Sequence, residues 1–294
     1  MNEKVRWTNL KDSQLVKLFG QKGLQTSRFI VRQVPKMKGL VQRKMSKTMT
    51  IKEVEKCAEQ FENIKQIKAK FVNRGWSILS VATKKKECIG QFYRAGKSYC
   101  KEKRKVYDHD FASLAAGRVG PHGSYEGGAN KGYPSIGKSK DTAEILCDNL
   151  RYHWQNRIQK EYPEADEMLL LMDGGGSNSR RHYSVKEDWQ KLANELGMKI
   201  TIAHYPAYCA KDNPIEHRLF PHLQRSWDAI VFENYDIVKA RAEQTTTETG
   251  LKVVAWINEK VYQTGRKYSD NFKETRPLKF DEILPQWNYQ ILPF

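Results

Sequence analysis

The spacing of apolar residues changes near residue 75, from a helical period to short strand-like runs. Before that point, apolar side chains recur every three or four positions, which is the period of an amphipathic helix. The pattern predicts helices over 12–19, 28–34 and 51–74. Thr26 or Ser27 can cap the second of these helices, and Pro35 is expected to end or kink it.

Beyond residue 75 the pattern predicts strands that alternate with helices. Apolar runs over 76–81 and 88–93 predict a hairpin whose tip carries three lysines. Further strands are predicted near 122–126, 167–172 and 199–204. Helices are predicted from Ser139 or Asp141 to Trp154, over 185–196, and from about Asn213 to Trp227. The order β-β-β-α-β-α-β-α implies an α/β fold in which helices flank a mixed sheet.

Positive charge is concentrated in the first fifty residues. They hold 12 lysines and arginines against the two acids Glu3 and Asp12, a net charge of +10 (12 − 2). Two helices around a glycine-containing turn, the second carrying Arg28 and Arg32, fit a helix-turn-helix that contacts DNA. An ordinary helical hairpin with a solvated basic face fits the same pattern. The predicted organisation is a small all-α DNA-binding region over 1–50, a connecting helix over 51–74 and a main domain over 75–294.

The whole chain is basic, and its composition narrows the classes of function. It has 51 lysines and arginines against 34 acids, a net charge of +17 over 294 residues, which favours a nucleic acid partner over an enzyme that happens to be basic. Five widely spaced cysteines without a Cys-x-x-Cys pair argue against a disulfide framework and against a zinc ribbon. No run approaches the ~18 apolar residues of a membrane span, so we expect no membrane partner and a cytoplasmic location.

Candidate chemistry follows the buried strand predicted over 167–172. That strand ends at Asp173, and three glycines and the pair Arg180 and Arg181 come after it. A carboxylate beside glycine-rich backbone and arginines suits a metal ion and a phosphate together, although Asp-Gly is also common in turns. Glu216 falls three residues after Asn213, which is the spacing of a helix capping box. Glu216 is therefore either part of that cap or a second acid near Asp173.

Several long motifs, taken together and in order, carry a family resemblance. They are ILSVATKKKECIGQFYRAGK, DHDF, SKDTAEILCDNLRYHW, LLLMDGGGSNSRRHY, IAHYPAYCAKDNPIEHRLFPH, TTTETGLKV and LPQWNYQI. In these stretches the chain closely resembles bacterial insertion-sequence DDE transposases of the ISAzo type, over nearly its whole length. The resemblance implies an RNase H-like catalytic domain and cut-and-paste DNA transposition with Mg²⁺ or Mn²⁺, bound as a pair of ions between carboxylates. It also implies double-stranded DNA as partner, both element ends and target, with homo-oligomers assembled on it in the bacterial nucleoid.

Position by position, the resemblance assigns catalytic and metal-binding roles to two acids. Asp173 matches the second acid of the family and Glu216 the third. The first acid stands directly before Thr-Lys-Lys-Lys-Glu, and here that place is Ala82. Losing one preorganised electrostatic group commonly costs about 10²–10³ in rate, so the chain is expected to be inactive or nearly so.

The same motifs carry the expected DNA contacts of the main domain. Lysines at the tip of the predicted hairpin and arginines after the glycine run are expected to meet DNA phosphates; they are Lys84, Lys85, Lys86, Arg180 and Arg181.

The origin of Ala82 stays open between an engineered knockout and a decayed or host-adopted copy that keeps DNA binding. Ala207, Ala210 and Asp212 also depart from the family's pattern, which favours decay. Family members tend to carry more sequence before residue 1, so a first helical unit is expected to be missing. A non-catalytic DNA-binding protein and an RNase H-type nuclease without transposition are the alternatives from other classes.

Overall fold

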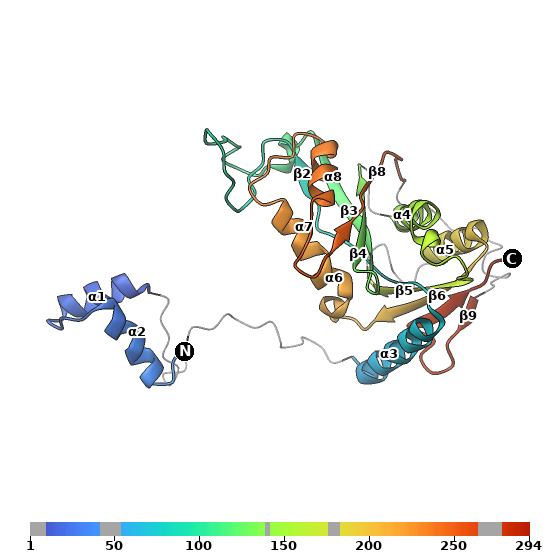
Figure 1. Cartoon of the computed structure of the whole chain (residues 1–294), viewed down its shortest axis with the longest axis horizontal. Helices are drawn as coiled ribbons and strands as arrows, with labels where there is room; N and C mark the ends of the chain where they lie inside the picture. The colour runs from blue at the N-terminus through green and yellow to red at the C-terminus, as the bar shows by residue number, and fades with distance from the viewer. Residues whose placement is uncertain (1–9, 42–53, 139–141, 176–182, 264–277) are drawn as a thin grey trace. The chain divides into compact units, whose positions relative to one another are not determined.

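The chain divides into two compact units, Met1–Ile51 and Lys52–Phe294 (Figure 1). The computed structural model describes residues 10–41, 54–138, 142–175, 183–263 and 278–294. Within these ranges, every helix is too short or too polar to span a bilayer.

The first unit contains two helices, α1 (Asp12–Gln21) and α2 (Arg28–Met37). The hydroxyl of Ser27 accepts a hydrogen bond from the backbone N–H of Ile30 at 3.3 Å, so Ser27 is the N-cap of α2 as its residue type predicts. The helix continues two residues past Pro35. Among the described residues of this unit only Val31 is buried.

The second unit is built on a mixed ten-stranded sheet. Its strands are β1 (Ile78–Thr83), β2 (Glu87–Ile89), β3 (Gly117–Glu126), β4 (Lys131–Gly137), β5 (Glu167–Asp173), β6 (Lys199–Tyr205), β7 (Lys252–Val253), β8 (Trp256–Asn258), β9 (Leu278–Phe280) and β10 (Asn288–Ile291). The order is β7-β4-β3-β1-β5-β6-β10-β9, and β2 and β8 pair with β3 and β4. The strands β4, β3 and β1 are antiparallel neighbours, whereas β1, β5 and β6 are parallel. The mixed sheet expected from the sequence is confirmed.

Helices cover both faces of this sheet (Figure 1). One face packs against α4 (Ala143–Asn156) and α5 (Tyr183–Leu196) through a core that includes Leu79, Val81 and Met172. The opposite face carries α3 (Cys57–Arg74) over β5 and β6, and α6 (Pro214–Arg218), α7 (Phe220–Ser226) and α8 (Tyr235–Glu243) over β1, β3 and β4. Short 3-10 helices lie at Ala112–Leu114, Ile158–Lys160 and Ala210–Asp212.

The hairpin predicted over residues 76–93 is wrong. β1 and β2 both pair with β3, one after the other, so that Thr83 lies opposite His122 and Glu87 lies opposite Val119. Three residues, 84–86, therefore face two on β3, which is a β-bulge within one long strand. The sequence Lys-Lys-Lys lacks the glycine, asparagine or aspartate that tight hairpin turns need, so the chain runs on. The hairpin in this region is instead β3–β4.

The helix predicted from Asn213 to Trp227 is broken into α6 and α7. Leu219, between them, has φ −122° and ψ −58°, outside the helical range. Pro221 lies in the first turn of α7 and has no N–H to donate to the preceding turn, which explains why a new helix starts here. The break leaves α6 as a short segment directly beside the end of β1.

Candidate active site

Ala82 and Asp173 lie at the ends of two neighbouring parallel strands. β1 pairs with β5 up to Val81, which lies opposite Met172. The next residue is Ala82 on β1 and Asp173 on β5. Val81 and Met172 point to the face covered by α4 and α5. Side chains alternate along a strand, so Ala82 and Asp173 both point to the opposite face. That is the face on which α6 carries Glu216.

A buried hydrogen-bond network joins α6 to β1. Asn213 donates from its side-chain amide to the carbonyl oxygen of Val81 at 3.1 Å, and its amide oxygen accepts from the hydroxyl of Ser80. Ser80 Oγ in turn accepts the backbone N–H of Ile215 at 2.8 Å. The cap of α6 is therefore supplied by a strand rather than by Asn213, which makes no capping bond of its own. The capping-box reading of Asn213 and Glu216 is wrong, and Glu216 is held beside the end of β1.

Glu216 has a perturbed titration. Burial raises the pKa of its carboxyl group, the negative charge of Asp173 raises it further, and the Lys84 ammonium partly offsets both. A carboxyl group whose pKa is raised by a second carboxylate in this way, close to a cation, is typical of catalytic and binding sites. The structure thus brings Asp173 and Glu216 together, with the Ala82 methyl group at the neighbouring strand end.

The side chains that the structure describes do not complete a metal site. Among the described residues, no group of three or more His, Cys, Asp or Glu side chains is placed to hold a metal ion. Asp173 and Glu216 supply two carboxylates, but a methyl group offers no donor atom where the resemblance implies the third. Hard divalent cations such as Mg²⁺ need several oxygen ligands, so the donor set falls short of what the family's chemistry requires.

The three lysines of the bulge are placed differently from one another. Lys84 is buried: its ammonium donates to Gln224 Oε1 at 2.5 Å and to Glu87 Oε1 at 3.3 Å, and lies 4.8 Å from the Trp227 ring centroid. Lys85 and Lys86 are exposed. A bulge re-aims successive side chains, which explains how one lysine turns inward while two face solvent.

The structure describes two of the four arginines that were expected to contact DNA. Arg28 and Arg32 are exposed on α2, and Arg32 forms an ion pair with Asp12 of α1 at 2.5 Å. Arg180 and Arg181 lie outside the described residues.

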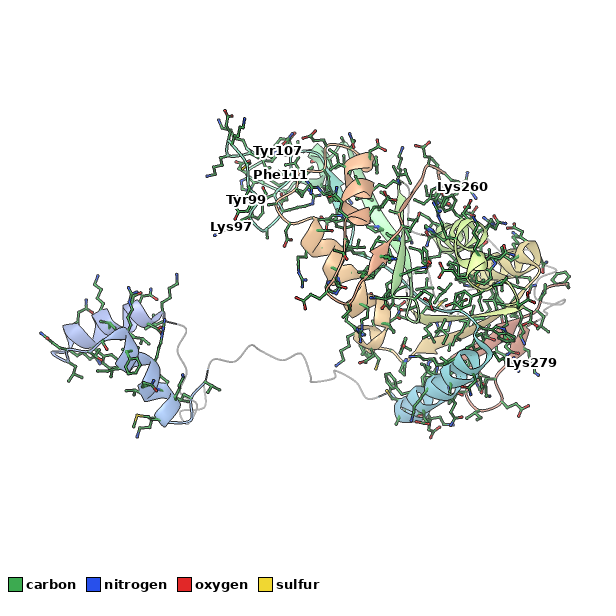
Figure 2. All side chains as sticks on the ribbon, viewed as in Figure 1. Lys97, Tyr99, Tyr107, Phe111, Lys260 and Lys279 are labelled. Atoms are coloured by element: carbon green, nitrogen blue, oxygen red, sulfur yellow. The ribbon has the colours of Figure 1, made fainter. Side chains whose placement is uncertain are left out.

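Sequence reasoning assigned no role to a basic arm between β2 and β3, here residues 96–106. It holds five basic residues and one acid, a net charge of +4, and the side chain of Tyr99 is fully exposed (Figure 2). Its base is fixed, because the guanidinium of Arg94 donates to Cys88 O at 2.7 Å and to Ile230 O at 3.2 Å and stacks 3.6 Å from the Phe232 centroid. The sequence places Tyr99 between Lys97 and Lys101, and this aromatic residue within a basic run could have identified the arm.

Comparisons with known proteins place these observations in a family. The family model described as Rhodopirellula transposase DDE domain matches residues 1–293. Two solved structures have a similar fold: the Mos1 transposase paired-end complex with left transposon end (15% identity, 82% of this chain and 72% of that chain, TM-score 0.46) and the Mos1 strand transfer complex (15%, 82% and 71%, TM-score 0.45). A likeness this distant carries no argument about function. No curated protein matches the chain.

The family match spans all but the last residue of the chain and includes Asp173 and Glu216. The resemblance inferred from the motifs is confirmed, and this chain belongs to the Rhodopirellula transposase DDE domain family.

Proposed function

We propose that this chain is the DNA transposase of an insertion sequence in a form whose cleavage and strand-transfer site is inactive because Ala82 replaces the first acid. Membership of the family supports the proposal that the chain is a transposase. The proposal that the site is inactive rests on the position of Ala82 beside Asp173, on the sheet face that also carries Glu216.

Asp173 and Glu216 would be the remaining catalytic and metal-binding acids. DDE transposases use divalent metal ions, which activate the attacking oxygen and stabilise the leaving oxygen when bound. Mg²⁺ is the proposed ion in an active form, and a solved complex of the mariner transposase Mos1 contains Mn. In this chain the two acids repel each other, as the raised pKa of Glu216 indicates, and no third carboxylate completes the set within the described residues.

Double-stranded DNA is the proposed partner. Lys85 and Lys86 project from the bulge that begins two residues after Ala82, and the basic arm adds a second exposed positive surface. Arg28 and Arg32 on α2 are proposed to contact the element ends, and Arg180 and Arg181 to contact phosphates near the acids. A homo-oligomer assembled on DNA is part of the same proposal.

Nicking of supercoiled plasmid carrying the element ends tests this function. The chain and its Ala82→Asp variant are compared in Mg²⁺ and in Mn²⁺, with Ala82→Asn as a control of similar size and no charge. We expect cutting by Ala82→Asp alone, and loss of that cutting when Asp173→Asn is added. Cutting by the unaltered chain would overturn the assignment of Ala82 as an inactivating residue.

A non-catalytic DNA-binding protein derived from such a transposase is the second candidate, and the incomplete donor set favours it. It predicts DNA binding that is steeply salt-dependent and indifferent to chelators. It also predicts no cutting by Ala82→Asp, because further changes would then have accumulated around Ala207 and Ala210.

A further inference from the structure

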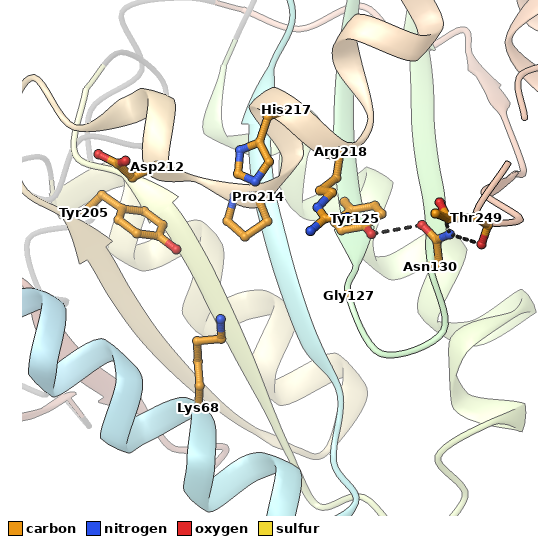
Figure 3. Close-up of a pocket in the computed structure, with 10 residues that line it drawn as sticks. All are labelled: Lys68, Tyr125, Gly127, Asn130, Tyr205, Asp212, Pro214, His217, Arg218 and Thr249. Atoms are coloured by element: carbon orange, nitrogen blue, oxygen red, sulfur yellow. Dashed lines mark hydrogen bonds between the residues drawn. The ribbon is translucent and has the colours of Figure 1, made fainter. Parts of the chain in front are cut away.

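A pocket of about 520 Å³ lies between α3, the end of β6, α6 and the turn that joins β3 to β4 (Figure 3). Its lining includes Lys68 from α3, Tyr205 from β6, and His217 and Arg218 from α6. The two α6 residues directly follow Glu216 in the chain. The pocket is therefore built partly on the helix that carries the third acid of the proposed active site.

The pocket is rich in hydrogen-bond donors. Figure 3 shows the Lys68 ammonium, the Tyr205 hydroxyl and the Arg218 guanidinium directed into the same space. Within the described part of the chain, these three groups make no hydrogen bond and no ion pair. Burial raises the pKa of Tyr205 to about 12, so its hydroxyl keeps its proton near neutral pH and remains a donor.

The charges around the pocket favour an anion. Lys68 and Arg218 contribute two positive charges, and among the described lining residues Asp212 contributes the single negative charge. The carboxylate of Asp212 acts on Tyr205, whose pKa it raises, and the Arg218 guanidinium acts on Tyr125, whose pKa it lowers against a larger effect of burial. A planar guanidinium beside an ammonium and a neutral hydroxyl matches the several acceptor oxygens of a phosphate. An apolar ligand or a metal cation would leave these donors unpaired.

We propose that this pocket binds a phosphate group, and that the group is a phosphodiester of a DNA strand lying across α6. The identity of the strand rests on the proposed function, whereas the phosphate chemistry rests on the donors alone. Lys68 and Arg218 bind the phosphate oxygens, and Tyr205 donates a third hydrogen bond. The strand is thereby held next to Glu216 by residues that belong neither to the acids nor to the lysines of the bulge.

The test is DNA binding without metal, in EDTA, by fluorescence anisotropy with a 20-base-pair duplex between 50 and 200 mM salt. The variants are Arg218→Gln, Lys68→Gln and Tyr205→Phe. Their matched controls are Arg225→Gln on α7 and Lys70→Gln on α3, which are exposed cations of the same types outside the pocket. We expect Arg218→Gln and Lys68→Gln each to weaken binding to every sequence and to lower the salt slope by about 1, with no change in the controls.

A second measurement separates a DNA phosphate from a free one. The thermal stabilisation of the chain by inorganic phosphate and by a nucleoside monophosphate is recorded for the same variants. If the variants lose this stabilisation while their DNA binding is unchanged, the pocket binds free phosphate. That result would overturn the proposal that it binds a phosphodiester of DNA. Arg218→Gln and Lys68→Gln matching their controls in both measurements would overturn the phosphate site itself. Failure of the unaltered chain to bind duplex DNA would contradict the proposed function. The thermal stabilisation by phosphate would still show whether the pocket binds a phosphate group.

Discussion

Asn213 donates a hydrogen bond to the carbonyl oxygen of Val81, so the segment that carries Glu216 is tied to the strand that ends at Ala82. Both Asn213 and its second partner, Ser80, are almost fully buried. The position of Glu216 therefore depends on polar contacts between residues more than 130 positions apart.

Replacing Asn213 by alanine should destabilise the fold. The change leaves Val81 O without this donor and Ser80 Oγ without its acceptor inside the protein, and each unsatisfied group costs about 1–3 kcal/mol. Urea unfolding measures the loss. Asn156→Ala is the control, because its side chain makes one hydrogen bond, to Tyr152 O, at an exposed site. A loss for Asn213→Ala no larger than that of the control would contradict the proposed anchoring.

Glu216 should make stability fall as pH rises above its ordinary pKa. Its pKa is raised in the folded chain, first by burial and then by Asp173, so the folded chain binds this proton more tightly than the unfolded chain does. The favourable contribution is present below the ordinary pKa and is lost as pH rises through the raised one. Glu216→Gln should therefore stabilise the chain at pH 7 and have no such effect at pH 4.

Unfolding by urea at both pH values, without divalent metal, measures this difference. Glu248→Gln, at an exposed site, is the matched control. Equal effects of Glu216→Gln at pH 4 and pH 7 would show that the pKa of Glu216 is not raised in the folded chain.

The lysines of the bulge should separate into two roles. Lys84→Met removes buried hydrogen bonds to Glu87 and Gln224 and should cost about 1–3 kcal/mol of stability. Lys85→Gln with Lys86→Gln should leave stability within about 0.5 kcal/mol. The same double change should lower the salt slope of DNA binding by about 2, because two phosphate contacts are lost. A salt slope that falls for Lys84→Met and not for the double variant would reverse this assignment.

Tyr99 of the basic arm should stack on unpaired bases. Its side chain is fully exposed beside Lys97 and Lys101, and stacking of a base on an aromatic ring contributes about 1–3 kcal/mol. Tyr99→Ala should weaken binding to a single-stranded oligonucleotide by roughly 5–150-fold, and Tyr99→Phe should restore it. Equal affinities for all three forms would exclude a stacking role.

The buried elements of this fold were predictable because their sequence signal is local. The run that became β5 is a continuous apolar stretch, and the run that became β6 is centred on the β-branched residues Ile200, Thr201 and Ile202, as expected of strands covered on both faces. The helix predicted up to Trp154 is α4, and one of its faces is buried through Ile145, Leu146, Asn149, Leu150, His153 and Trp154.

Partners that are distant in sequence were not predictable. Strand-like runs at β1 and β2 do not say which strand they pair with, and the intervening lysines do not reveal that Lys84 meets Gln224, 140 residues away. The spacing from Asn213 to Glu216 fits a capping box, but Ser80 satisfies the helix N-terminus instead. β10, from the C-terminal motif, pairs with β6 and was not predicted as a strand at all.

The most direct test of the vacated first-acid position is Mn²⁺ binding, measured by calorimetry on the chain, on Ala82→Asp and on Ala82→Asn. A third carboxylate beside Asp173 and Glu216 should create a divalent metal site, so Ala82→Asp alone should bind Mn²⁺ and be stabilised by it against heat. Adding Glu216→Gln to that variant should remove the binding. Mn²⁺ binding of equal strength by the unaltered chain and by Ala82→Asp would contradict the account, because the site would then be complete without a carboxylate at position 82.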